Sequence, residues 1–215
     1  MSRKNGLFIT LEGGHGCGKS SIASLIVGKL RSLGLNVVGT NDQTGTVVGR
    51  ELRRINLELT QQRISYLVEA LLVAAARHQN VIEIIKPNLS QRRVVVCERF
   101  TDAFIAFQGF GRKLPMELLE NINSVVADGI KPDLTILLDI DPRIALNRIS
   151  NQLKHRIEME PLNFHRKIRE GYLSQSRKYP TRIKVLDANF PVEVVFENVW
   201  NEVKKIITKR RKQLC

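Results

Sequence analysis

The chain has 215 residues, 43% of them hydrophobic, and a formal net charge of +13. This length suits one α/β domain with a substantial core. No apolar run approaches the roughly 18 residues needed to cross a bilayer, so we expect no membrane partner. The three cysteines, Cys17, Cys97 and Cys215, have no metal-ligand spacing and are too scattered for a disulfide framework. We therefore expect a reducing, cytoplasmic setting.

The excess positive charge lies mainly between Arg143 and Arg169 and in the tail from Lys204 to Lys212. Nucleic-acid binding is one interpretation of such a charge, but no zinc-finger spacing or aromatic RNA-binding signature accompanies it. A basic helix end also complements the helix dipole, and positive potential helps any enzyme that handles phosphates. We therefore expect no nucleic-acid partner.

Strand-like and helix-like segments alternate along the chain. In chain order we expect strand Leu7–Leu11, helix Ser20–Leu33, strand Asn36–Gly39, helices Val47–Leu59 and Gln62–Ile85, strand Val94–Cys97, helices Asp102–Phe107 and Pro115–Ala127, strand Leu134–Asp139, helices Pro142–Leu153 and Asn163–Arg177, strand Arg182–Leu186 and helix Val192–Arg210. Uniformly apolar strands are typical of a parallel sheet. No repeat or linker interrupts the pattern, so we expect a single domain over residues 1–215.

The segment Gly13–Ser20 matches the phosphate-binding pattern G-x-x-x-x-G-K-[ST] in full, between a strand and a helix. Its glycines let backbone N–H groups turn inward around phosphate oxygens, and the helix start adds positive charge. Lys19 is placed to reach the β- and γ-phosphates and Ser20 to ligate Mg²⁺. The alternative, a Gly-rich turn that binds nothing, is disfavoured by the strand before it and the helix after it. The expected nucleotide-binding residues are Gly13, Gly14, His15, Gly16, Cys17, Gly18, Lys19, Ser20 and Ser21.

The motif and the alternation together predict a P-loop NTPase-type α/β fold, with a doubly wound five-stranded parallel sheet flanked by helices. Glu98 and Arg99 directly follow the expected third strand. In such sheets ligands bind beyond the carboxyl ends of the strands. Glu98 could then hold Mg²⁺ or its water, and Arg99 could bind a transferring phosphoryl group. The alternative is a salt bridge at the strand end.

Arg77 follows the apolar helical stretch from Ala70 to Ala76. Burying an arginine without an anionic partner is costly, so an anionic ligand is one explanation for it. The alternative is that Arg77 marks the place where the helix emerges into water, since long basic side chains reach solvent easily.

The order and spacing of several short motifs resemble the thymidylate kinase family of nucleoside monophosphate kinases over essentially the whole chain. The motifs are Leu11-Glu12-Gly13, Ala75-Ala76-Arg77, Ile85-Lys86-Pro87, Glu98-Arg99-Phe100, Lys131-Pro132-Asp133 and Arg156-Ile157-Glu158. The resemblance implies transfer of the γ-phosphoryl group of ATP to a deoxynucleoside monophosphate, normally dTMP, with Mg²⁺. It also implies a homodimer.

The resemblance further assigns residues to roles. Expected catalytic residues are Lys19, Arg99, Arg156 and Arg148. Expected substrate-binding residues are Arg53, Val73, Arg77, Arg99, Phe107 and Gln108, with Arg77 at the acceptor phosphate and Gln108 beside the base. Expected metal ligands are Ser20 and Glu98. Residues 148–162 resemble a lid that carries Arg148 and Arg156 over the phosphates, although a solvated basic helix face is the alternative for each basic residue there.

Several positions depart from the family pattern. His15 stands where the family usually has an acidic residue near the acceptor sugar, Val73 where an aromatic ring stacks on thymine, and Phe107 where tyrosine is usual. The run Asn41–Thr46 replaces a family segment that contains arginine and proline. The donor half of the site is thus kept and the acceptor half altered. This leaves open a kinase for another nucleotide or a deoxynucleoside, or a nucleotide-binding protein with little catalysis.

Overall fold

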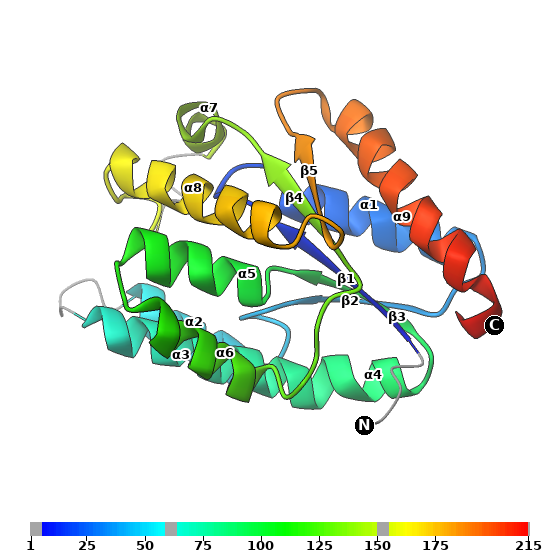
Figure 1. The fold of residues 1–215 in the computed structure, drawn as a ribbon, viewed down its shortest axis with the longest axis horizontal. Helices are drawn as coiled ribbons and strands as arrows, with labels where there is room; N and C mark the ends of the chain where they lie inside the picture. The colour runs from blue at the N-terminus through cyan, green and yellow to red at the C-terminus, as the bar shows by residue number, and fades with distance from the viewer. Residues whose placement is uncertain (1–5, 59–63, 150–154, 215) are drawn as a thin grey trace.

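The computed structural model describes residues 6–58, 64–149 and 155–214. Its centre is a parallel sheet with strand order β2-β3-β1-β4-β5, in which every neighbouring pair is parallel (Figure 1). The strands are β1 (Leu7–Glu12), β2 (Val37–Asn41), β3 (Val94–Glu98), β4 (Leu134–Asp139) and β5 (Ile183–Asp187). The predicted α/β fold with five parallel strands is confirmed.

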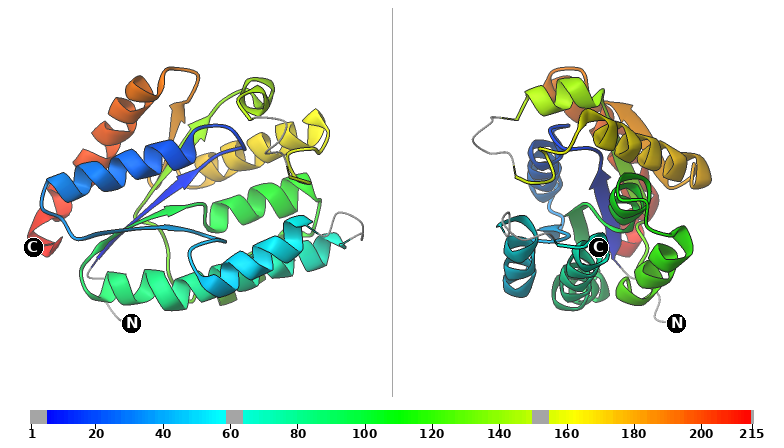
Figure 2. Two further views of the ribbon diagram at one scale, coloured as in Figure 1. Left: turned by 180° about the vertical axis from the view of Figure 1, so that it is seen from behind. Right: turned by 90° about the vertical axis from the view of Figure 1, so that its left-hand side faces the viewer.

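Helices cover both faces of the sheet (Figure 2). Their bounds are α1 (Lys19–Ser32), α2 (Val47–Glu58), α3 (Tyr66–Asn80), α4 (Lys86–Ser90), α5 (Thr101–Phe104), α6 (Met116–Val126), α7 (Pro142–Asn147), α8 (Leu162–Lys178) and α9 (Val192–Leu214), with π-helical turns η1 (Val81–Ile85) and η2 (Ile105–Gly111). Helices α1 and α9 pack together on one face, and α8 packs with η2 and α5 on the other.

Alternate residues of β1 supply the two halves of the core. Leu7, Ile9 and Leu11 are fully buried against α1 and α9, whereas Phe8 packs on the opposite face against η1 and α4. The buried hydroxyl of Thr10 is hydrogen-bonded to that of Thr135 on β4 at 2.7 Å, so it does not carry the cost of an unpaired polar group. A strand buried on both faces reads as continuously apolar, which is why its sequence predicted it well.

Two helices run further than their sequences predict. The helix that we expected over Gln62–Ile85 continues through η1 and α4 to Ser90, while Gln62 lies outside the described residues. Pro87 has no N–H to donate, and the wider π turn before it lets the helix pass that residue. The segment expected to end at Phe107 continues as η2 to Gly111, where the Arg112 N–H donates to the Phe107 carbonyl.

Other boundaries also differ. Strand β2 begins one residue later than expected and extends to Asn41, because β3 pairs with it as far as Glu98. Helix α7 ends at Asn147, before the expected Leu153, which lies outside the described residues. Asp141 caps the start of α7 by accepting the Arg143 N–H at 2.8 Å.

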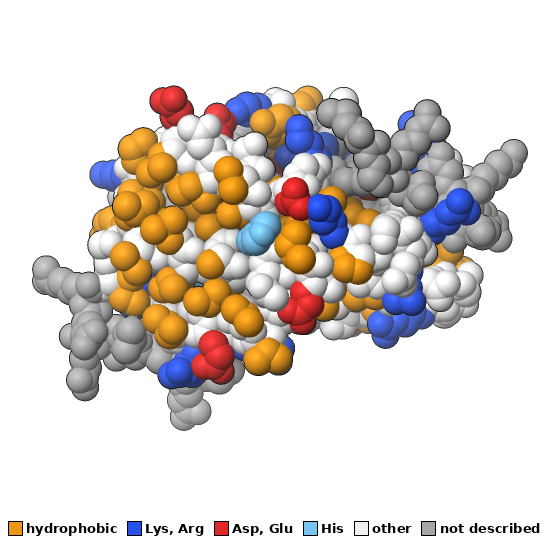
Figure 3. Space-filling model, turned by 90° about the horizontal axis from the view of Figure 1, so that it is seen from below, with side chains coloured by type: hydrophobic (Ala, Val, Ile, Leu, Met, Phe, Trp, Pro, Cys, Tyr) orange, Lys and Arg blue, Asp and Glu red, His pale blue; other side chains and the backbone are white. Residues whose placement is uncertain are grey.

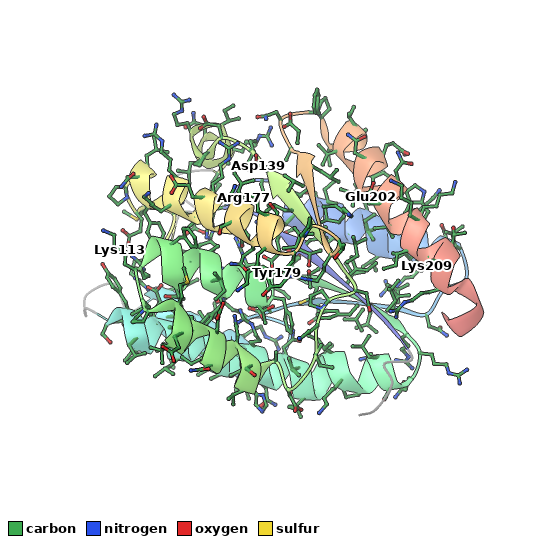
Figure 4. The ribbon with its side chains drawn as sticks, viewed as in Figure 1. Lys113, Asp139, Arg177, Tyr179, Glu202 and Lys209 are labelled. Atoms are coloured by element: carbon green, nitrogen blue, oxygen red, sulfur yellow. The ribbon has the colours of Figure 1, made fainter. Side chains whose placement is uncertain are left out.

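Two ion pairs tie helices to the sheet. Asp139 at the end of β4, labelled in Figure 4, accepts two hydrogen bonds of 2.7 Å from Arg169 of α8. Arg210 of α9 binds Asp133 at 2.9 Å, so part of the basic tail anchors the last helix beside β4. Within the described residues no helix is long and apolar enough to span a membrane.

Phe8→Ala should lower the free energy of unfolding by about 3–5 kcal/mol, because it empties a fully buried site where the ring packs edge-on against Phe100 at 5.0 Å. Urea unfolding followed by circular dichroism measures the change. Leu33→Ala is the control: its side chain is 55% exposed, so a change within about 0.5 kcal/mol is expected. Equal losses in the two variants would contradict this account of the core.

Candidate active site

The phosphate loop connects β1 to α1, and its glycines are required for two reasons. Gly13, Gly16 and Gly18 have φ angles of 139°, 73° and 90°, which side chains other than glycine's rarely allow. A Cβ on Gly13 would lie 2.5 Å from the Leu138 carbonyl oxygen, and one on Gly16 would collide with the Ala145 carbonyl. The loop is therefore wedged against the ends of β4 and α7, which fixes its curvature.

The ammonium of Lys19 lies inside this loop. Lys19 Nζ donates to the Gly14 carbonyl at 2.5 Å and to Cys17 Sγ at 3.3 Å. Burial lowers the pKa of Lys19, and the nearby charge of Arg99 lowers it further. Cys17 is buried under the loop and fills space beside Gly13.

Ser20 and Glu98, the two predicted metal ligands, meet at the mouth of the loop. Ser20 Oγ donates to Glu98 Oε2 at 2.6 Å. A hydroxyl and a carboxylate are oxygen donors of the kind that Mg²⁺ prefers. Among the described residues no three His, Cys, Asp or Glu side chains gather around a possible metal position. These two residues therefore fit a Mg²⁺ ion only if phosphate oxygens and water complete its coordination.

Arg99 is held at the boundary between the phosphate loop and the adjoining cavity. Its φ angle is 65°, and its N–H donates to the Leu11 carbonyl at 2.9 Å. Arg99 Nη1 donates to the Gly13 carbonyl and to the Tyr172 hydroxyl, both at 2.9 Å, and the guanidinium lies 4.9 Å from the centre of the Phe107 ring. These contacts orient one cation toward the place where loop and cavity meet.

Glu12 and Tyr172 support this arrangement, and neither was predicted as a site residue. Buried Glu12 accepts the Phe100 N–H at 2.7 Å and the Tyr172 hydroxyl at 3.1 Å. Burial, reinforced by the charge of Asp102, raises the pKa of Glu12 to about 8. In the sequence, the feature that could have identified Glu12 is its position as a carboxyl group at the end of an apolar strand. No sequence signal marked Tyr172 on the amphipathic helix α8.

A cavity opens beside Arg99, between α2, α3, η2 and residues 155–160. All the expected substrate-binding residues line it: Arg53, Val73, Arg77, Arg99, Phe107 and Gln108. His15 from the phosphate loop also lines it, so the loop and the cavity form one continuous site.

Arg77 is fully buried, so the alternative that it emerges into water is wrong. Its Nε and Nη2 atoms donate to the two carboxylate oxygens of Asp42 at 2.9 and 2.6 Å, and Nη1 donates to Asn123 at 2.8 Å. The carboxylate of Asp42 raises the pKa of Arg77 against the opposing effect of burial. Asp42 belongs to the segment Asn41–Thr46 and is the anionic partner that the sequence did not identify.

Glu69 organises the far end of the cavity. Its carboxylate accepts hydrogen bonds from Gln108 Nε2 and Arg112 Nε at 3.1 Å each, and from Arg156 Nη2 at 2.7 Å. These donors lower the pKa of Glu69 although burial opposes them. Gln108 Oε1 is buried and has no hydrogen-bond partner among the described residues. It is therefore an acceptor available to a ligand in the cavity.

Comparison with known proteins assigns this site to a family. A family model described as "Thymidylate kinase" matches residues 11–199. Thymidylate kinases of Clostridium novyi and Nostoc punctiforme are each 39% identical to the chain, over 93% and 95% of its length and 98% of theirs. The chain belongs to the thymidylate kinase family. The crystal structure of thymidylate kinase from Ehrlichia chaffeensis is 28% identical, covers 92% of this chain and 98% of its own, and superimposes with a TM-score of 0.76.

The two arginines predicted for the lid, Arg148 and Arg156, are bound to groups outside the phosphate loop. Arg156 Nη2 donates to the Asn56 side chain at 3.1 Å and to Glu69, at the far end of the cavity. Exposed Arg148 donates from Nη1 to the Ala188 carbonyl at 3.1 Å, beyond the end of β5. Among the described residues neither side chain is hydrogen-bonded to the phosphate loop, whereas Arg99 donates to the Gly13 carbonyl. Basic composition identified this segment, but it does not determine which groups the side chains face.

Glu12→Gln should remove a pH dependence of stability. With a folded-state pKa of about 8 against an ordinary value of 4.5, Glu12 keeps a proton in the folded protein that the unfolded chain releases. Stability should therefore fall as the pH rises from about 5 to 8, by on the order of 1–4 kcal/mol, and this decline should be smaller in Glu12→Gln. Urea unfolding at pH 5, 6.5 and 8 measures it.

The control for this measurement is Glu170→Gln, at an exposed position on the same helix as Tyr172. This variant should reproduce the wild-type decline. An equally steep decline in Glu12→Gln would show that Glu12 is ionised throughout the range.

Proposed function

We propose that this protein transfers the γ-phosphoryl group of ATP to dTMP, giving ADP and dTDP, with Mg²⁺ as cofactor. Membership of the thymidylate kinase family supports the reaction class. The observation that carries the proposal is Arg99, whose guanidinium is bound to the phosphate loop at Gly13 and also lines the acceptor cavity. One cation can therefore serve the donor and the acceptor phosphates.

The donor phosphates would lie in the nest of N–H groups at residues 13–18, with Ser21 at the helix start beside them. During transfer the bond from the γ-phosphorus to the bridging oxygen of ADP breaks, and a bond to an acceptor phosphate oxygen forms. Lys19 and Arg99 would stabilise the charge on the transferring group, since such reactions depend on positioning and charge neutralisation. Ser20 and Glu98 would hold Mg²⁺, which neutralises phosphate charge when bound.

The acceptor would extend from Arg99 to Gln108. Its phosphate would bind Arg99 and Arg53, which is positioned by a 3.2 Å hydrogen bond from Nη1 to Gln43. Its base would lie against Val73, with an N–H group donating to the free Gln108 Oε1. Arg77 lines the same cavity and would offer its two remaining N–H groups to the ligand, while the Phe107 ring packs beside Arg99.

We propose that Arg156 and Arg148 reach the phosphates only after their side chains leave their present partners. Arg156 would have to leave Glu69 and Asn56, and Arg148 would have to leave the Ala188 carbonyl. We further propose that residues 1–215 act as one cytoplasmic kinase domain.

A second candidate function is a kinase for another pyrimidine deoxynucleotide. The observation that favours it is Val73, which offers an aliphatic surface in the cavity where the family usually has an aromatic ring. Loss of a stacking partner weakens the preference for one base over another more than it weakens phosphate binding.

The first test is ADP formation from Mg-ATP with dTMP, dUMP, dCMP, dGMP and free thymidine as acceptors. We expect the highest kcat/KM with dTMP, because thymine has both an N–H that can donate to Gln108 Oε1, which cytosine lacks, and a methyl group that can pack on Val73, which uracil lacks. Lys19→Ala is the inactive control and should lower kcat by about 100-fold or more. A preference for dCMP would overturn the choice of acceptor, and normal turnover by Lys19→Ala would overturn the kinase mechanism.

We also propose that the protein is a homodimer that associates through α3 and α6. Hydrophobic side chains gather on the face formed by the lower helices of Figure 1, as Figure 3 shows. The exposed hydrophobic side chains of α3 and α6 include Leu67, Leu71, Leu118 and Val125, with exposed fractions of 38% to 74%. Monomeric proteins rarely expose a large contiguous apolar patch, and a second copy related by a two-fold axis covers one with an identical patch.

Leu71→Glu should convert this dimer into monomers, because it places a charge within the apolar patch. Light scattering after gel filtration should give twice the 24.4 kDa chain mass for the wild type and a single chain mass for the variant. Leu33→Glu, at the C-terminal end of α1, is the matched control and should stay dimeric. A wild-type mass of one chain would reject the proposed dimer.

A further inference from the structure

The phosphate loop and the segment before α8 are joined by one close contact. His15 Nδ1 lies 2.6 Å from Glu158 Oε1, and only 16% and 9% of the two side chains are exposed. Both residues line the cavity next to Arg99 and Arg53. The contact therefore places a carboxylate in the wall of the site, and the sequence did not predict it.

The protonation states of the pair follow from its surroundings. Burial lowers the pKa of His15 to about 4, and the positive charges of Arg99 and Lys19 add to this effect. The imidazole N–H holds the pKa of Glu158 at about 2. At neutral pH the ring is thus neutral and the carboxylate ionised, so Nδ1 must carry the hydrogen and donate it to Glu158.

Further contacts hold this carboxylate in place. Glu158 Oε2 accepts the His155 backbone N–H at 3.1 Å. The imidazole of His15 packs edge-on against the Phe107 ring at 5.3 Å, which fixes the direction of Nδ1. Buried Ile157 anchors the backbone beside Glu158. The carboxylate is therefore fixed before any ligand arrives.

The position of Glu158 indicates which part of a ligand it meets. Arg99 donates to the Gly13 carbonyl of the phosphate loop, which suits it to a phosphate, whereas Gln108 is bound to Glu69 and offers a free acceptor that suits a base. A nucleotide carries its sugar between these two groups. A carboxylate only accepts hydrogen bonds, and each of its oxygens has a second lone pair available. A sugar hydroxyl is the donor that fits it.

We propose that Glu158, positioned by His15, accepts a hydrogen bond from the 3′-hydroxyl of the acceptor deoxynucleotide and so selects acceptors that carry this group. The inference rests on the proposed function for the identity of the acceptor. Glu158 is the specificity-determining residue, and His15 is a positioning residue that acts through it. His15 replaces the acidic side chain that is usual in the family, and the carboxylate comes from the lid segment instead.

The test compares dTMP with its 3′-deoxy analogue, 2′,3′-dideoxythymidine monophosphate. Wild-type protein should favour dTMP by about 10- to 100-fold in kcat/KM, as expected for a hydrogen bond to a charged acceptor. In Glu158→Ala this preference should fall to within about threefold, while the KM for ATP stays unchanged. The exposed control Glu170→Ala should keep the full preference.

Substitutions of His15 test its positioning role. His15→Asn retains an N–H donor close to the position of Nδ1 and should keep most of the preference for dTMP. His15→Ala should lose this preference, as Glu158→Ala does. His15→Asp would set two carboxylates against each other and should raise the KM for dTMP at neutral pH. Melting temperatures of all variants separate these effects from loss of fold.

Two results would overturn the inference: no preference for dTMP in the wild type, or equal loss of both acceptors in Glu158→Ala with the ratio preserved. Dissociation constants from calorimetry, measured with dTMP and with its 3′-deoxy analogue, give the same ratio independently of turnover. Absence of turnover rejects the proposed function, while equal dissociation constants reject the role of Glu158.

Discussion

Arg77 has no contact with solvent, and the cost of removing its guanidinium from water is offset by two hydrogen bonds to Asp42 and one to Asn123. This buried pair joins β2 to α3 and so sets the distance between the sheet and the helix that forms one wall of the cavity. The rest of the acceptor side depends on that spacing. Val73 lies on the same helix as Arg77, one turn before it, and lines the cavity.

Other buried charged groups around the site also need hydrogen-bond partners, as Arg77 does. Arg99 is bound to the Gly13 carbonyl and to Tyr172, whose hydroxyl in turn donates to Glu12. Each buried charge needs partners, and the partners come from elements far apart in the sequence. The resulting network is preorganised, so that little rearrangement is needed when charge develops in a transition state. The network also buries the carboxyl group of Glu12, and this burial disfavours its ionisation near neutral pH.

Because the partners of the buried charges come from elements far apart in the sequence, some features of the site could be predicted from the sequence and others could not. Glycine-rich turns, apolar strands and a lysine at a helix start are local signals, and they predicted the sheet and the turn between β1 and α1 correctly. The pairing of Arg77 with Asp42, or of Glu69 with Arg156, depends on tertiary contacts that no local pattern encodes. The π turns were missed because helix periodicity is defined for 3.6 residues per turn and Pro87 reads as a helix end.

The two halves of the site therefore tolerate change differently. Backbone N–H groups form the proposed donor side, so its geometry depends on glycines whose replacement would strain the loop against Leu138. Side chains form the acceptor side, where a substitution in one element can be matched by a partner from another. His15 illustrates the point, since it contributes no carboxylate itself but is bound to that of Glu158. A change of side chain at the phosphate loop can thus leave a negative group in the wall of the cavity while moving its source to the segment before α8.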